Sequence, residues 1–151
     1  MTHILLSAGY PQTLRADGGG GISLAQPPNN HRQTDVAAVS FTGLITTVVG
    51  APTTWSLGAR LAFLQPHTSG YQYTRPEWIE TTPEYLGARV TGATVQADGL
   101  IQIADQAAPL GHGFGISIPE LLVDSVRIHF KPTFSGGTTP GLRLALTMTE
   151  K

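Results

Sequence analysis

The chain has 151 residues, of which 40% are hydrophobic and 13% are charged, and its net charge is −1. This length predicts one domain with one core. So little charge gives no bulk attraction to nucleic acid and suits a surface that partners cover. Cysteine is absent, which excludes disulfides and thiolate chemistry. No apolar stretch has the length of a membrane span and the start lacks the basic region of a signal peptide, so we expect neither.

The first 35 residues are rich in glycine, proline and asparagine, notably at residues 18–21 and 27–30. This composition predicts an extended arm, residues 1–35, that does not fold by itself and contacts the following body, residues 36–151, very little. We expect a neighbouring subunit to hold the arm by strand addition. The apolar residues that would fill pockets of that neighbour, and that we predict to bind it, are Ile4, Leu5, Leu6, Tyr10, Leu14, Ile22 and Leu24.

Three strands are predicted after the arm. The first covers residues 36–41 and ends at Thr42-Gly43, and the second covers residues 44–49 and ends at Gly50. The third, residues 53–64, has the period of two that is typical of a strand with one buried face. Its side chains that we expect to face the core are Trp55, Leu57, Ala59, Leu61 and Phe63.

Residues 71–85 combine prolines with aromatic residues and predict a loop with short edge strands. The aromatic cluster consists of Tyr71, Tyr73, Trp78 and Tyr85, with Arg75 among them. Three interpretations stay open, because such residues anchor a protein interface, cap the core or stack on sugar rings. We take Tyr71, Tyr73 and Trp78 as predicted partner-binding residues.

The Asp98-Gly99 pair predicts a hairpin turn between strands at residues 89–95 and 100–103. Short helical turns are expected at residues 104–108 and 119–123, the second because it opens with proline. These are the main departures from strand and loop in the expected structure.

The C-terminal residues 124–151 predict a β-hairpin whose strands are joined by residues 135–141. The in-phase apolar residues that we expect to be buried are Val126, Ile128, Phe130, Leu142, Leu144 and Leu146, while His129 should point outward. Short strands with turns about every ten residues predict an all-β fold: an antiparallel β-sandwich or jelly roll with an extended N-terminal arm.

The sequence contains no catalytic constellation that we recognise, and we expect no enzyme activity, no cofactor and no metal site. The five histidines lack metal-ligand spacing and are interpreted as solvent-facing or strand-polar. Residues 110–115 are glycine-rich but lack a P-loop pattern, which favours a tight turn or close backbone packing over a phosphate cradle. Glu77, Glu80 and Glu84 are interpreted as solvated acids rather than a glycosidase pair.

Residues 41–57 and 124–133, followed by Gly136-Gly137-Thr138-Thr139-Pro140 and a final alternating strand, resemble a pattern from small β-sandwich virion proteins of tailed bacteriophages. The resemblance implies a capsid decoration (cement) protein that binds and stabilises the assembled shell. Proteins of this kind have no catalytic residues to carry over.

The resemblance also implies where the protein works and with which partners. These would be the major capsid protein and further copies of this chain, in a homotrimer on the virion assembled in the host cytoplasm, without nucleic acid or membrane contact. Two alternatives stay open. One is another virion part, such as a head-fibre base, tail tube or baseplate component. The other is a carbohydrate-binding module that uses Tyr71, Tyr73 and Trp78.

Overall fold

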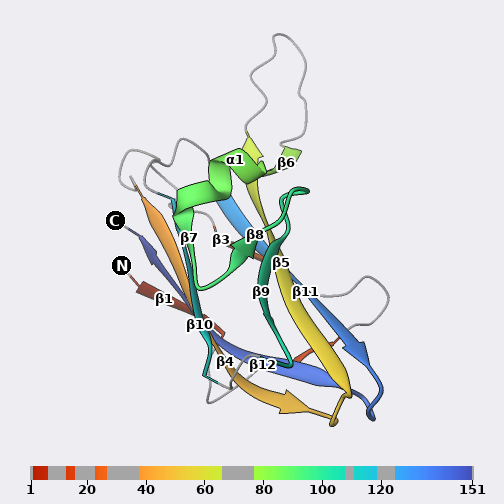
Figure 1. The fold of residues 1–151 in the computed structure, drawn as a ribbon. Coiled ribbons are helices and arrows are strands. Elements are labelled where there is room, and N and C mark those ends of the chain that lie inside the picture. The colour runs from red at the N-terminus through yellow and green to blue at the C-terminus, as the bar shows by residue number, and fades with distance from the viewer. Residues whose placement is uncertain are drawn as a thin grey trace.

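The protein is a sandwich of two antiparallel β-sheets, which confirms the predicted fold class (Figure 1). The computed structural model describes residues 2–6, 13–15, 23–26, 38–65, 77–107, 111–118 and 125–150. Within that part of the chain, no helix is long and apolar enough to cross a membrane.

In the described part of the chain, each sheet has six strands. Sheet A has the order β1 (Thr2–Leu6), β12 (Gly141–Glu150), β4 (Val39–Val49), β10 (Gly113–Ile118) and β7 (Val90–Thr91), and β2 (Thr13–Leu14) also pairs with β12. Sheet B has the order β3 (Ser23–Gln26), β11 (Ser125–Ser135), β5 (Thr54–Gln65), β9 (Ile101–Asp105) and β8 (Thr94–Val95), and β6 (Glu77–Glu80) also pairs with β5. The short helices α1 (Pro83–Leu86) and η2 (Gly87–Arg89) lie between β6 and β7.

The chain repeatedly crosses from one sheet to the other. β4 is followed by β5, β7 by β8, β9 by β10 and β11 by β12, and in each case the two strands belong to different sheets. The order β12-β4-β10-β7 in sheet A therefore matches the order β11-β5-β9-β8 in sheet B. In Figure 1 this crossing is clearest where β4, in orange, leads into β5, in yellow.

The predicted C-terminal hairpin is wrong in its pairing, although both of its strands exist. β11 pairs with β3 and β5, whereas β12 pairs with β1, β2 and β4. The reason lies in the connection, which crosses the sandwich and is tied to the similar crossing between β4 and β5. The Thr138 N–H donates to the Gly50 carbonyl and the Thr53 N–H to the Ser135 carbonyl, both at 2.8 Å. Gly50 and Gly137 have φ of 79° and 78°, which favour glycine.

The core lies between the sheets and follows the predicted alternation. All six apolar residues of β11 and β12 that were expected to be buried are fully buried, and Met148 joins them. On β5, Trp55, Leu57, Ala59 and Leu61 are buried as predicted, while Phe63 is half-buried against the edge of the core. The rings of Phe114 on β10 and Phe130 on β11 meet edge to face across the sandwich, 6.2 Å apart.

Gly43 does not separate two strands as predicted, because β4 runs unbroken through it. Gly43 pairs with Phe114 of β10, and a Cβ at this position would overlap the Phe114 ring. The glycine is therefore required by close packing inside the sheet, not by a turn. The β10 strand was itself missed, since Gly113 and Gly115 interrupt the pattern that Phe114, Ile116 and Ile118 set.

The expectation that residues 1–35 contact the body very little is wrong for their described parts. β1 and β2 pair with β12 at one edge of sheet A, and β3 pairs with β11 at one edge of sheet B. Arg15, directly after β2, donates to the backbone oxygens of Thr139 and Pro140. Unpaired backbone groups at the edges of a sandwich favour such strand addition, and here the chain's own N-terminal part supplies it.

The connection between β6 and β9 combines confirmed and corrected features. The predicted Asp98-Gly99 turn joins β8 to β9, with Gly99 at a φ of 87°. Thr82 caps α1 by accepting a hydrogen bond from the Tyr85 N–H. The helical turn expected at residues 104–108 is wrong at its start, because Ala104 continues β9 into the core. The turn expected at residues 119–123 lies outside the described residues.

Candidate interaction surface

Part of the outer face of sheet A consists of two rows of mostly small residues in register across neighbouring strands. Thr147 of β12, Thr42 of β4, Gly115 of β10 and Thr91 of β7 form one row. The next row consists of Ala145, Leu44 and Gly113. These positions face outward because their neighbours along each strand, such as Phe41 and Phe114, are buried in the core.

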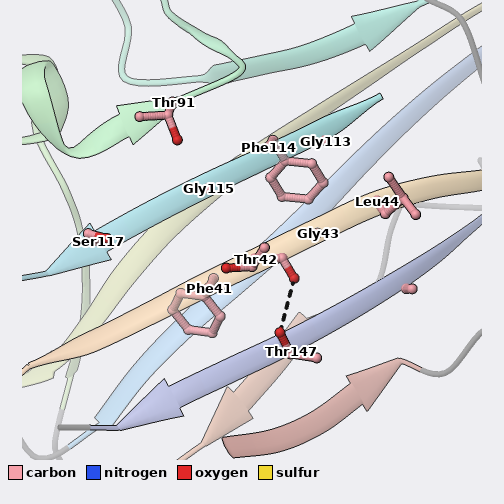
Figure 2. Close-up of a pocket in the computed structure, with 11 residues that line it drawn as sticks. Phe41, Thr42, Gly43, Leu44, Thr91, Gly113, Phe114, Gly115, Ser117 and Thr147 are labelled. Carbon is pink, nitrogen blue, oxygen red and sulfur yellow. Dashed lines mark hydrogen bonds between the residues drawn. The ribbon is translucent and has the colours of Figure 1, made fainter. Parts of the chain in front are cut away.

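A shallow trough of about 580 Å³ lies on this face (Figure 2). It exists because Gly113 and Gly115 have no side chains where neighbouring strands carry threonine, alanine or leucine. The residues that line it are uncharged without exception: Phe41, Thr42, Gly43, Leu44, Thr91, Gly113, Phe114, Gly115, Ser117, Ala145 and Thr147. The Thr147 hydroxyl lies 3.5 Å from the Thr42 carbonyl, the hydrogen bond drawn in Figure 2.

Leu44 projects beside this trough. Its exposed fraction is 41%, and among the residues whose side chains are described only Ile79 on β6, at 43%, is another large hydrophobic residue with such exposure. Single exposed leucines are ordinary on protein surfaces. What distinguishes Leu44 is its place, because it pairs directly with Gly113 in the trough.

The outer face of sheet B has a different chemistry, centred on Arg60 of β5. One guanidinium nitrogen of Arg60 donates to the Asp98 backbone carbonyl at 3.0 Å, and the other donates to the Asp98 carboxylate at 3.1 Å. Glu80 of β6 lies 3.6 Å from the same guanidinium. Through these contacts Arg60, on the central strand β5 of sheet B, stabilises the positions of the β8–β9 turn and of β6.

Asp98 is further held by the backbone of its own turn. The Leu100 N–H donates to the carboxylate at 3.1 Å. This hydrogen bond, followed by those from Arg60, holds the pKa of Asp98 below its usual value of 3.8, because each stabilises the charged form.

Basic side chains follow the adjacent strand β11 on the same outer face. Arg127, His129 and Lys131 alternate with buried Val126, Ile128 and Phe130, as the sequence predicted for His129. His129 pairs with Arg60 in the register of β5 and β11. Sheet B therefore presents several cationic groups, while the trough on sheet A presents none.

The predicted partner-binding residues have different outcomes. Leu14 is fully buried in the protein's own core, so it does not fill a neighbour's pocket. Ile4, Leu5 and Leu6 lie on β1, Leu24 on β3 and Trp78 on β6, where the backbone is described but the side chains are not. Tyr10, Ile22, Tyr71 and Tyr73 lie outside the described residues.

The other residues considered for catalysis or metal binding have structural roles wherever the structure describes them. His112 forms a 2.7 Å hydrogen bond with the Gly92 carbonyl, and Glu80 interacts with Arg60. In the described ranges, no group of three histidine or acidic residues has the geometry of a metal site. Gly111 has a φ of 90° in a turn, and the glycines after it belong to β10, which fits backbone packing rather than a phosphate cradle.

The sequence did not predict the trough itself. Two segments of the sequence form it, Thr42-Gly43-Leu44 and Gly113-Phe114-Gly115. In each segment the first and third residues face outward, and a buried aromatic residue, Phe41 or Phe114, lies next to them in the sequence. Nothing in the sequence pairs those segments, so the trough is visible only in three dimensions. No protein-family model, curated protein or solved structure matches the chain.

Proposed function

We propose that the protein is a structural part of a bacteriophage virion, a capsid decoration protein that binds the assembled shell and stabilises it. The support is the resemblance of residues 41–57 and 124–133 to small virion sandwiches, together with the sandwich fold. The major capsid protein and further copies of this chain are its proposed partners.

The observation that carries this proposal is the uncharged trough on the outer face of sheet A. A face of threonine, glycine and alanine with one projecting leucine offers shape and apolar contact, and no charged group has to be desolvated when a protein covers it. Such a trough suits contact with another subunit of an assembly, and further copies of this chain are among the proposed partners.

The described part of the N-terminal arm changes the proposed mechanism. Because β1, β2 and β3 complete the protein's own sheets, they act as fixed parts of the sandwich. Contact with the shell is therefore assigned to the folded sandwich and to the arm residues outside the described part, such as Tyr10 and Ile22.

A cement protein acts by mass action, because binding to the assembled shell but not to the separate subunit stabilises the shell. The test uses particles from which the protein has been omitted or stripped. Their thermal rupture is measured with and without added wild-type protein, at low and high salt. We expect add-back to raise the rupture temperature at both salt concentrations, because uncharged contacts are not screened. Unchanged rupture, or rescue lost at high salt, would contradict the proposal and favour a tail or fibre role.

A further inference from the structure

Leu44 and the glycines beside it form a projection and a hollow on the same face of sheet A (Figure 2). Leu44 of β4 pairs in register with Gly113 of β10, and Gly115 is the next outward position along β10. Among the described residues, a Cβ at Gly113 would meet nothing closer than the Gly43 carbonyl oxygen at 3.8 Å, whereas a Cβ at Gly115 would lie 3.0 Å from the Thr91 hydroxyl. The projection and the hollow are thus immediate neighbours.

We propose that this face binds the same face of a second copy, with Leu44 of each copy lying over Gly113 and Gly115 of the other. Consider a twofold axis that lies in the plane of contact and runs between β4 and β10. This axis places each outward-facing β4 residue of one copy over the residue of β10 in the other copy with which it pairs in register. The same operation places both leucines in both hollows, which is the self-complementarity that a twofold interface requires. Sheet faces stack in this way at a separation of about 10 Å.

Electrostatics favour a second copy on sheet A and oppose it on sheet B. Two copies of the uncharged trough meet without like charges. On sheet B the same arrangement would bring the exposed Lys131 of β11 toward its own copy, and like charges across an interface are costly.

The size of the face predicts a weak pair. Four strands about 4.8 Å apart, and six residues of β10 at about 3.4 Å each, give roughly 400 Å² per copy before side-chain relief. This lies at the low end of protein interfaces, so the pairing should depend on concentration. If the proposed function also holds, a pair presents the remaining surface of the sandwich to the shell twice and contacts two neighbouring shell subunits.

The test is the mass of the full chain in solution, measured by sedimentation over protein concentrations from about 1 to 500 μM, a range that covers weak pairs. Wild-type protein should shift from one copy to two. Leu44→Asp should weaken the pairing about tenfold or more, because it places a carboxylate in an apolar hollow. Gly113→Val should also weaken it by filling the hollow. Ile79→Asp is the matched control, because Ile79 is equally exposed but lies on β6 of sheet B, and it should pair as wild type does.

Several outcomes would overturn the inference: wild-type protein that stays a single copy throughout, a three-copy mass, or equal weakening by Ile79→Asp. Thermal unfolding establishes whether each variant is folded. If Leu44→Asp does not fold, the sedimentation result for Gly113→Val decides the inference. The pairing is measured on the protein alone, whereas shell binding is measured on particles with wild-type protein. Failure of one is therefore distinguishable from failure of the other.

Discussion

The two outer faces of the sandwich differ far more than the two inner faces. Inside, both sheets supply fully buried aliphatic and aromatic side chains to one core. Outside, sheet A carries an uncharged trough with Leu44 beside it, whereas sheet B carries Arg60 bound to two acidic residues and a row of basic residues on β11. The inner positions are constrained by packing and the outer ones are not, so the outer faces are where two sheets of one fold acquire different roles.

The largest effect on stability should come from shortening a side chain on the buried face of sheet A rather than one on its outer face. Leu144→Ala, in the core, should lower the free energy of unfolding by roughly 2–5 kcal/mol through lost burial and a cavity. Leu44→Ala, on the outer face of the same sheet, should change it by less than about 0.5 kcal/mol. Denaturant unfolding of both variants at low protein concentration measures the difference. Similar losses would mean that Leu44 is packed within its own chain.

The glycines of sheet A allow a finer test of inside against outside. Gly43→Ala should cost about 1–3 kcal/mol, because its methyl group meets the Phe114 ring in a packed core. Gly113→Ala, on the paired strand, should be neutral or stabilise by up to about 1 kcal/mol, since alanine restricts the unfolded chain and has room here. The comparison of inner and outer positions fails if the two variants rank in the opposite order in urea unfolding.

On sheet B, Arg60 should matter for stability and its basic neighbour should not. Arg60→Met should cost about 1 kcal/mol, chiefly through the lost hydrogen bond to the Asp98 carbonyl. Lys131→Met is the matched control on the same face, because Lys131 is exposed, and it should stay within about 0.5 kcal/mol of wild type. The measurement is the unfolding midpoint of each variant. Equal effects would show that the Arg60 contacts do not fasten the turn.

The smallest effect should appear in acid. Because the pKa of Asp98 is lowered on folding, its stabilising contribution is present above the usual value of 3.8 and is lost as the pH falls through the lower folded pKa. Asp98→Asn should therefore reduce the melting temperature near pH 6, and the gap to wild type should narrow toward pH 2. Melting curves across this range give the answer, and a gap that is constant with pH would assign the effect of the substitution to packing.

The sequence was informative about strands and uninformative about their partners. The alternation in residues 126–130 and 142–146 predicted both strands and their buried faces, since period two has one structural meaning. It also suggested pairing them as neighbours, but the loop between them crosses the sandwich, and loop residues alone do not distinguish a turn within a sheet from a crossing between sheets. The strands of residues 1–35 escaped prediction because their pairing with β11 and β12 stabilises them more than local composition does.

The candidate surface was still harder to predict. Gly43 was interpreted as part of the end of a strand, and Gly113 and Gly115 as part of a tight turn or of close backbone packing. In the structure these residues lie in strands, where one glycine admits an aromatic ring and two others open a trough. The meaning of each depends on the residue across from it, which only the register between β4 and β10 supplies.

The crossing of consecutive strands between sheets also governs how the chain reaches its folded state. Leu61 pairs with Ile128 and Phe41 with Met148, so the central strands cannot close as short hairpins and must first bring distant parts of the chain together. Sandwiches of this kind fold on the order of milliseconds to seconds, more slowly than proteins rich in local contacts. While β11 and β12 are still being synthesised, β4 and β5 lack their main partners and expose strand edges to other nascent chains. Synthesis of β11 and β12 is thus the step after which the molecule can form its own fold instead of aggregating.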